Sequence, residues 1–194
     1  MTTLYTAFDG HSMVAAGPLA QVAAAVKAAH DAGRTVLVFD DADARPVELD
    51  LRGDLRAVLQ RLPTAPPAAD DGAPERRGRG RPKLGVTARE VTLLPRHWDW
   101  LASQPGGASV TLRKLVEAAL REAEGPDRAR LSREAAYRFM TAVAGDLPGY
   151  EEAVRMLFAG DWTRFDEQTQ AWPADVRDYA RRLAEPGWRN GQGR

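Results

Sequence analysis

The stretch "GPLAQVAAAVKAAHDAGRTVLVFDD", residues 17–41, joins an amphipathic helix to a buried strand. Proline near the start and glycine near the end are typical helix boundaries, here Pro18 and Gly33. Between them, apolar residues recur at helical spacing, at Leu19, Val22, Ala23 and Val26. The following "RTVLVFDD" is a continuous apolar run, which is typical of a buried strand. A helix beside such a strand indicates a mixed α+β fold.

Turn and alternation signals on both sides extend this unit. Residues 3–16, "TLYTAFDGHSMVAA", predict a β-hairpin that turns at Asp9-Gly10. Residues 45–53, "RPVELDLRG", alternate apolar and charged side chains and predict a half-buried strand. Residues 54–61 predict a short helix capped by Asp54. We therefore expect a small α+β domain over residues 1–61, ordered strand, strand, helix, strand, strand, helix.

Residues 62–85 interrupt this pattern. They are rich in Pro, Ala, Gly and charged residues, which predicts a flexible basic linker. Over residues 86–124, "REVTLLP" predicts a strand, "RHWDWLASQPGG" a short helix, and "SVTLRKLVEAALREAEG" a long helix that ends at Gly125. Residues 130–186 predict a C-terminal helical bundle. Its expected core residues are Phe139, Tyr150, Met156, Leu157, Phe158, Trp162, Phe165, Trp172 and Tyr179.

Charge is unevenly distributed, although the chain carries 27 Lys and Arg against 27 Asp and Glu. Residues 76–121 contain ten basic and three acidic side chains, a net charge of +7. Such a basic block indicates a polyanionic partner. The absence of cysteine excludes disulfides and thiolate zinc sites. No run approaches the roughly 20 apolar residues that span a bilayer, and no signal peptide is visible. We expect a cytoplasmic protein without a membrane partner.

The stretch "RRGRGRPKLG", residues 76–85, lies at the start of that block and resembles an AT-hook. In that motif an extended Arg-Gly-Arg lies in the minor groove of A·T-rich DNA, because glycine permits close approach and arginines follow the negative potential of a narrow groove. The flanking cations contact phosphates. The departure from the motif is Gly78, where a leading proline is usual. The DNA-binding residues implied are Arg76, Arg77, Arg79, Gly80, Arg81, Pro82 and Lys83. A solvated basic linker is the alternative.

The strand, helix, Gly-rich turn and helix of residues 86–124 resemble a ribbon–helix–helix domain. "VTLLPRHWDWLA" is similar to its strand and first helix, and "TLRKLVEAALREA" to its second helix. The resemblance implies a homodimer through the strand around Val91, with the paired strands in the major groove of double-stranded DNA. It implies DNA contacts by Thr92, Thr111 and Arg113. The alternative is an ordinary helical core in which Trp98, Trp100 and Leu101 are packing residues.

Nearly the whole chain also resembles an uncharacterised bacterial family, the domain-of-unknown-function group numbered 2239. The resemblance rests on residues 80–121, on the opening "TAFDG" and on the later "GDLPGYEEA". That family carries no established activity, so the resemblance implies no mechanism.

Motifs of catalysis are lacking. The three histidines, His11, His30 and His97, have no metal-ligand spacing, and no P-loop, dinucleotide fingerprint or nucleophile elbow occurs. Asp40-Asp41-x-Asp43 follows a strand and has ligands that suit Mg²⁺, but we interpret it as a polar hairpin loop, because Asp is favoured in turns. We therefore expect no catalytic residues, no metal and no cofactor.

These observations favour a DNA-binding protein, of the transcription-regulator or nucleoid-associated type, on A·T-rich duplex at the nucleoid. The alternative is a non-enzymatic adaptor between proteins, with the basic segment as a tether. A third hypothesis is an enzyme whose unfamiliar site contains Asp9, His11, Asp40 and Asp41.

Overall fold

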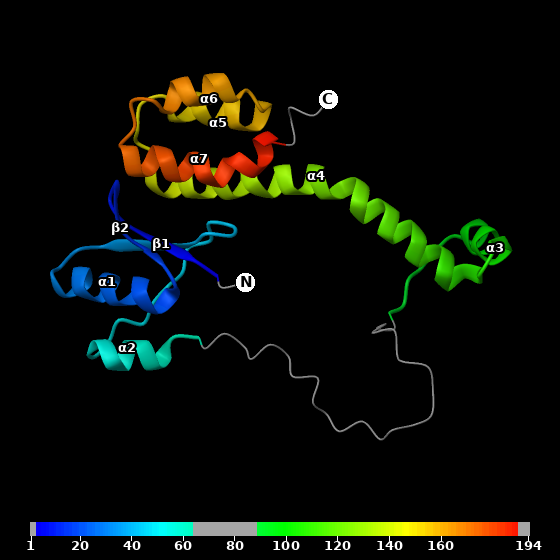
Figure 1. Ribbon diagram of the computed structural model, residues 1–194, viewed down its shortest axis with the longest axis horizontal. Helices are drawn as coiled ribbons and strands as arrows, with labels where there is room; N and C mark the ends of the chain where they lie inside the picture. Colours follow the sequence, from blue (N-terminus) through cyan, green and yellow to red (C-terminus); the bar gives the residue numbers. More distant parts are fainter. Residues whose placement is uncertain (1–2, 64–88, 190–194) are drawn as a thin grey trace. The chain divides into compact units, whose positions relative to one another are not determined.

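The computed structural model describes residues 3–63 and 89–189. Over these residues the chain is a mixed α+β structure, mostly helical, with seven helices and one three-stranded antiparallel sheet (Figure 1). The predicted α+β class is confirmed in this coarse form. The chain divides into two compact units, the first made of Met1–Leu62 with Ala123–Arg194 and the second of Pro63–Glu122. Among the helices described, none has the length and apolar character needed to cross a membrane.

The sheet of the first unit is built on a central strand. Strand β1 (Tyr5–Asp9) lies between β2 (Ser12–Gly17) and β3 (Val36–Asp40) and is antiparallel to both. The predicted hairpin therefore forms, with its two-residue loop one position later than expected, because Asp9 still pairs with Ser12. Gly10 in this loop has a φ of +55°, which glycine adopts without strain.

Helix α1 (Leu19–Asp31) covers one face of the sheet. Because side chains alternate along a strand, Ala7 of β1 and Val38 of β3 point to this face. There they pack against Val22 and Val26 of the helix, and all four are buried. The helix and strand predicted from residues 17–41 are thus confirmed.

The predicted strand over residues 45–53 is not formed as a ladder. Its one bridge pairs Pro46 with Phe39, and the amide of Val47 donates to the carbonyl of Val38 at 2.8 Å. Pro46 lacks an N–H group and contributes no ladder donor of its own. The alternation itself persists, since Val47, Leu49 and Leu51 pack on the α1 face of the sheet. Helix α2 (Leu55–Arg61) follows, with the Asp54 carboxylate accepting from the Ala57 amide at 2.8 Å, as expected for its cap.

The opposite face of the sheet is covered by helices from the other end of the chain. Helices α4 (Gly107–Val143) and α7 (Ala174–Arg189) lie against it, and α5 (Tyr150–Ala159) and α6 (Trp162–Thr169) pack beyond them (Figure 1). Phe139 is the centre of the contact, with ring centroids 5.0 Å from Phe8, 5.3 Å from Phe39 and 4.5 Å from Tyr179. The sequence predicted separate domains over residues 1–61 and 130–186. In the structure, side chains of both segments belong to one aromatic core.

Most of the predicted core residues of the helical segment are buried. Tyr150 and Trp162 are partly buried against the core. Phe158 is the exception, because it is 50% exposed on the outer side of α5. The fully buried members are Phe139, Met156, Leu157, Phe165, Trp172 and Tyr179.

Helix α4 continues where the sequence predicted an end. It runs from Gly107 to Val143 through Gly125 and Pro126, so one helix crosses the boundary between the two units. An interior proline removes one intrahelical hydrogen bond. An ion pair spans the site, with the Arg128 guanidinium 2.5 Å from the Glu124 carboxylate. The helical turns after Pro126 are also held by packing, because Ala129 and Ser132 are buried.

The described part of the second unit begins at residue 89. Residues 89–94 form no strand in the single chain, which differs from the prediction around Val91. Helix α3 (Pro95–Ser103) begins at a proline, as helices often do, and a turn at Gly106-Gly107 leads into α4. Residues 89–94 have no second strand within this segment to pair with. A two-stranded ribbon around Val91 would require a pairing strand from another copy of the chain.

Candidate functional site

The predicted DNA-contact residues fall into two groups. Arg76, Arg77, Arg79, Gly80, Arg81, Pro82 and Lys83 lie outside the described residues. The others are described: Thr92 is exposed ahead of α3, and Thr111 and Arg113 lie in the first turns of α4. Arg113 is exposed, and no carboxylate of the described chain lies within ion-pair distance of it. Its guanidinium is accordingly accessible to an external anion.

Large apolar side chains are exposed throughout the second unit. Between residues 89 and 122 only Leu101 is buried. The stripe on α4 that the sequence assigned to a core, with Leu115, Val116 and Leu120, faces solvent in the single chain. The exposed residues are Val91, Leu94, Trp98, Trp100, Leu115, Val116 and Leu120, each between 39% and 63% exposed.

The four side chains of the hypothetical enzyme site do not come together. The β1–β3 register pairs Asp9 with Val36 and Tyr5 with Asp40, so Asp9 and Asp40 lie four residues apart along the strands, about 13 Å. Asp9 pairs with Arg34 at 3.1 Å, and His11 lies 3.4 Å from Asp146. The proposed constellation is therefore not formed.

The acidic loop after β3 is occupied by structural hydrogen bonds. The Asp40 carboxylate accepts from the Ala42 amide at 2.8 Å, and the Asp43 carboxylate accepts from the Arg45 amide at 3.0 Å. Such bonds are typical of Asp-containing turns. Within residues 3–63 and 89–189, no cluster of three or more His, Asp or Glu side chains has the geometry of a metal site. The turn interpretation therefore accounts for Asp40 and Asp43.

Asp41 instead connects the sheet to α7. Its carboxylate accepts from the Thr6 hydroxyl at 2.7 Å and the Tyr179 hydroxyl at 2.9 Å, and Arg182 donates to it at 3.2 Å. The Arg182 guanidinium also lies 4.6 Å from the centre of the Tyr179 ring. Burial, and then the charge of Asp41, raise the pKa of the Tyr179 phenol well above its ordinary value of 10.0. The phenol thus remains a hydrogen-bond donor rather than a base.

Sequence reasoning missed this network because its members are far apart in the chain. Thr6 and Tyr179 are separated by most of the sequence, and neither belongs to a recognisable motif. The only local signal was Asp41 itself, at the end of a buried strand.

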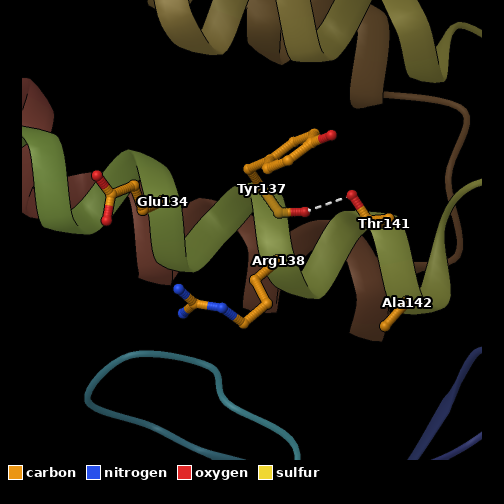
Figure 2. Close-up of a pocket in the computed structure, with 5 residues that line it drawn as sticks. All are labelled: Glu134, Tyr137, Arg138, Thr141 and Ala142. Atoms are coloured by element: carbon orange, nitrogen blue, oxygen red, sulfur yellow. Dashed lines mark hydrogen bonds between the residues drawn. The ribbon is translucent and has the colours of Figure 1, made fainter.

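A hollow of about 440 Å³ lies on the outer face of α4 in the first unit. Figure 2 shows its lining residues Glu134, Tyr137, Arg138, Thr141 and Ala142, all of them on this helix. The Thr141 hydroxyl donates to the Tyr137 carbonyl at 2.9 Å. Arg138 points away from Tyr137, toward the loop that precedes α2, and donates to the Asp43 carbonyl. The hollow therefore combines an exposed aromatic ring with charged groups.

Comparison with known proteins gives one match. The model of a family described as "Uncharacterized protein conserved in bacteria (DUF2239)" matches residues 4–184. No curated protein and no solved structure matches the chain. The family match covers most of both segments of the first unit and the whole of the second.

Proposed function

We propose that this chain, which belongs to the DUF2239 family of uncharacterized proteins conserved in bacteria, is a dimeric DNA-binding protein. The observation that carries the proposal is the second unit, where exposed apolar helix faces directly follow a basic segment. The apolar faces supply a dimer interface, and the basic segment supplies a grip on phosphate.

A second copy of the chain is the partner proposed for the apolar faces. A segment as short as residues 89–122 buries too little surface to be stable alone. Val91 and Leu94 ahead of α3, and Leu115, Val116 and Leu120 on α4, are the side chains that a twofold contact would cover. In this proposal the residues around Val91 pair with the same residues of the second copy.

The proposed DNA contacts are of two kinds. Arg79 and Arg81 lie in the minor groove of A·T-rich duplex, where the negative potential is deepest. Thr92 faces base edges from the paired strands, and Thr111 and Arg113 contact phosphate near the start of α4. Arg76, Arg77 and Lys83 add phosphate contacts, which makes affinity dependent on salt.

Binding to short A·T-rich and G·C-rich duplexes, measured by fluorescence anisotropy over a salt series, tests the DNA contacts. We expect A·T-rich duplex to be preferred, and the double variant Arg79→Ala, Arg81→Ala to bind it more weakly. The slope of log affinity against log salt should decrease by about 0.9 for each phosphate that the variant no longer neutralises. A matched control is Arg128→Ala with Arg130→Ala, since both side chains pair with acids of α4. Equal affinity of the arm variant and the wild type would contradict the proposal.

Sedimentation equilibrium tests the dimer separately. We expect a dimer for the wild type and a monomer for Val116→Glu with Leu120→Glu, because a charge in an apolar interface is strongly unfavourable. Leu59→Glu on α2 changes a comparably exposed leucine of the first unit and should leave the dimer intact. A wild-type monomer that binds DNA fully would rule out the dimer while leaving the DNA contacts in place.

The anisotropy titration with A·T-rich and G·C-rich duplexes also distinguishes the DNA-binding proposal from the second candidate function, an adaptor between proteins. The exposed apolar side chains of residues 91–120 suit a different protein as well as a second copy. In that case DNA binding would be weak and indifferent to base composition, and a stoichiometric protein partner would remain bound after nuclease treatment.

A further inference from the structure

We propose that the outer face of α4 in the first unit binds an acidic peptide segment of another protein. The surface consists of Arg133, Tyr137 and Arg138 on α4 and Phe158 on α5, and we call it the α4 outer surface. This inference does not depend on DNA binding, because all of its residues belong to the first unit.

An exposed aromatic pair forms the apolar part of the α4 outer surface. Tyr137 is 41% exposed and Phe158 is 50% exposed, although both belong to helices whose other faces are buried. The rings meet edge to face, with centroids 5.5 Å apart. Rigid aromatic side chains are the commonest energetic centres of protein interfaces.

Two arginines on either side of Tyr137 in the sequence have no carboxylate partner among the described residues. Most arginines of the first unit lie within 4 Å of an acid, including Arg130 and Arg155 on the same two helices. Arg133 has no such pair, and its buried Nε has no hydrogen-bond partner. Arg138 donates to the main-chain carbonyl of Asp43 and has donors to spare.

The chemistry of a guanidinium group selects the partner. Its planar fork matches a carboxylate with two parallel hydrogen bonds. Arg133 lies one helical turn before Tyr137, and Arg138 lines the hollow but points away from the Tyr137 ring. Two guanidinium groups placed on either side of an exposed aromatic ring suit a segment in which acidic side chains flank an apolar one. Glu134 also lines the hollow, but its carboxylate is 2.9 Å from Arg130 and is already compensated.

The hollow beside Tyr137 provides the space for the partner's apolar side chain. Its volume of about 440 Å³ lies in the range of ligand sites, and its floor includes the methyl group of Ala142. The Thr141 hydroxyl that lines it is hydrogen bonded to the Tyr150 hydroxyl at 2.9 Å and to the Tyr137 carbonyl at 2.9 Å, so it already has partners. An apolar side chain is therefore the favoured occupant.

The charge of the first unit favours a peptide over a nucleic acid. Residues 3–62 and 123–189 contain 16 Lys and Arg against 20 Asp and Glu, a net charge of −4. A polyphosphate chain would place many charges against this negative surface, whereas a peptide places only one or two carboxylates at the two arginines. Single-stranded nucleic acid, which also stacks on aromatic rings, is the competing occupant for the test.

Selection of random dodecapeptides on the immobilised full-length chain, followed by anisotropy with the enriched peptides, tests the proposal. We expect the enriched sequences to combine Asp or Glu with an aromatic or aliphatic residue. Phe158→Ser should weaken their binding about tenfold or more, as the loss of a central aromatic does. Arg133→Gln with Arg138→Gln should weaken it as well, and added salt should reduce the difference. Arg138→Gln alone is the second variant if the double variant fails to fold.

Matched controls come from α2 of the same unit. Arg56→Gln changes an exposed arginine and Leu59→Ser an exposed leucine, and neither should alter binding. The proposal is overturned if no peptide is enriched, if enriched peptides lack acidic residues, or if they bind Phe158→Ser as tightly as the wild type. Binding of oligothymidylate with the same dependence on Phe158, without peptide binding, would overturn it in favour of nucleic acid.

Discussion

The two units of this chain place similar apolar residues in opposite environments. In the first unit Phe8, Phe39 and Phe139 are fully buried in one cluster, contributed by both ends of the chain. In the second, Trp100, Val116 and others on the described helices remain about half exposed. Burial of a large apolar side chain contributes about 1.5–3 kcal/mol, so the first unit carries most of the stability of the single chain. The described part of the second unit leaves its large apolar side chains exposed in the single chain.

The largest expected effect comes from the centre of the buried cluster. Phe139→Ala removes a ring that touches Phe8, Phe39 and Tyr179 and should lower the free energy of unfolding by about 3–5 kcal/mol. Chemical denaturation followed by far-UV circular dichroism measures it. The control Phe158→Ala removes a half-exposed ring and should cost far less. Similar losses of unfolding free energy for the two variants would contradict the distinction between buried and exposed rings.

A close approach of two helices gives the next effect. A Cβ atom at Gly187 of α7 would lie 2.6 Å from the Ser132 hydroxyl oxygen and 3.3 Å from the Ala129 carbonyl oxygen of α4. Gly187→Ala should therefore destabilise the first unit by about 1–3 kcal/mol.

Gly125→Ala is the control, because a Cβ atom there meets no atom within 4 Å beyond its chain neighbours and the backbone of its own helix. The ring of Pro126 disfavours a Cβ atom on the preceding helical residue, which offsets the gain of up to about 1 kcal/mol from the helix propensity of alanine. Thermal melting distinguishes the two substitutions. A destabilisation at Gly125 equal to that at Gly187 would show that the close approach does not matter.

The pKa of Tyr179 gives a pH dependence confined to the first unit. Its phenol has a pKa raised above 10.0 in the folded chain by burial and by Asp41. The folded state therefore holds the proton longer than the unfolded state, so this contribution to stability is present below pH 10.0 and is lost as pH rises above it. Urea unfolding across this range should show a steeper decline for the wild type than for Tyr179→Phe. Parallel declines would contradict the assignment.

The smallest effect is expected at the exposed stripe of the second unit. Leu120 is 63% exposed, so Leu120→Ala should change the unfolding of the single chain by about 0.5 kcal/mol or less. If a second copy covers this face, the destabilisation grows with protein concentration, because association stabilises the folded state. Melting over a series of concentrations measures this. A large destabilisation that is independent of concentration would mean that Leu120 is buried within one chain.

Local patterns in the sequence predicted the elements whose partners are close in the chain. The hairpin, α1, β3 and the Asp54 cap all follow from residues a few positions apart. Phe158 was expected in the core together with its neighbours Met156 and Leu157, and only the docking of α5 distinguishes the buried face from the exposed one. The end predicted at Gly125 failed because packing of Ala129 and Ser132 outweighs a local helix-breaking signal.

The contacts between distant parts were not predictable from one sequence. Thr6, Asp41, Tyr179 and Arg182 meet only because the sheet and α7 pack together. The sequence also did not indicate that Arg133 and Arg138 lack a carboxylate partner among the described residues. A count of charges does not say which acid lies near which arginine. The predicted arm of Arg79 and Arg81 lies outside the described residues and stays a prediction.

The shared aromatic core also has a consequence for how the chain is made. Phe8 and Phe39 are synthesised before Phe139, whose ring packs against both, and Tyr179, which packs against Phe8, is added 140 residues after Phe39. At a synthesis rate of about 5–20 residues per second, roughly 7–30 s pass between the synthesis of Phe39 and that of Tyr179. During that interval the two phenylalanines are incompletely covered and accessible to chaperones, and a product truncated before α7 lacks the contact that Tyr179 makes with Phe8.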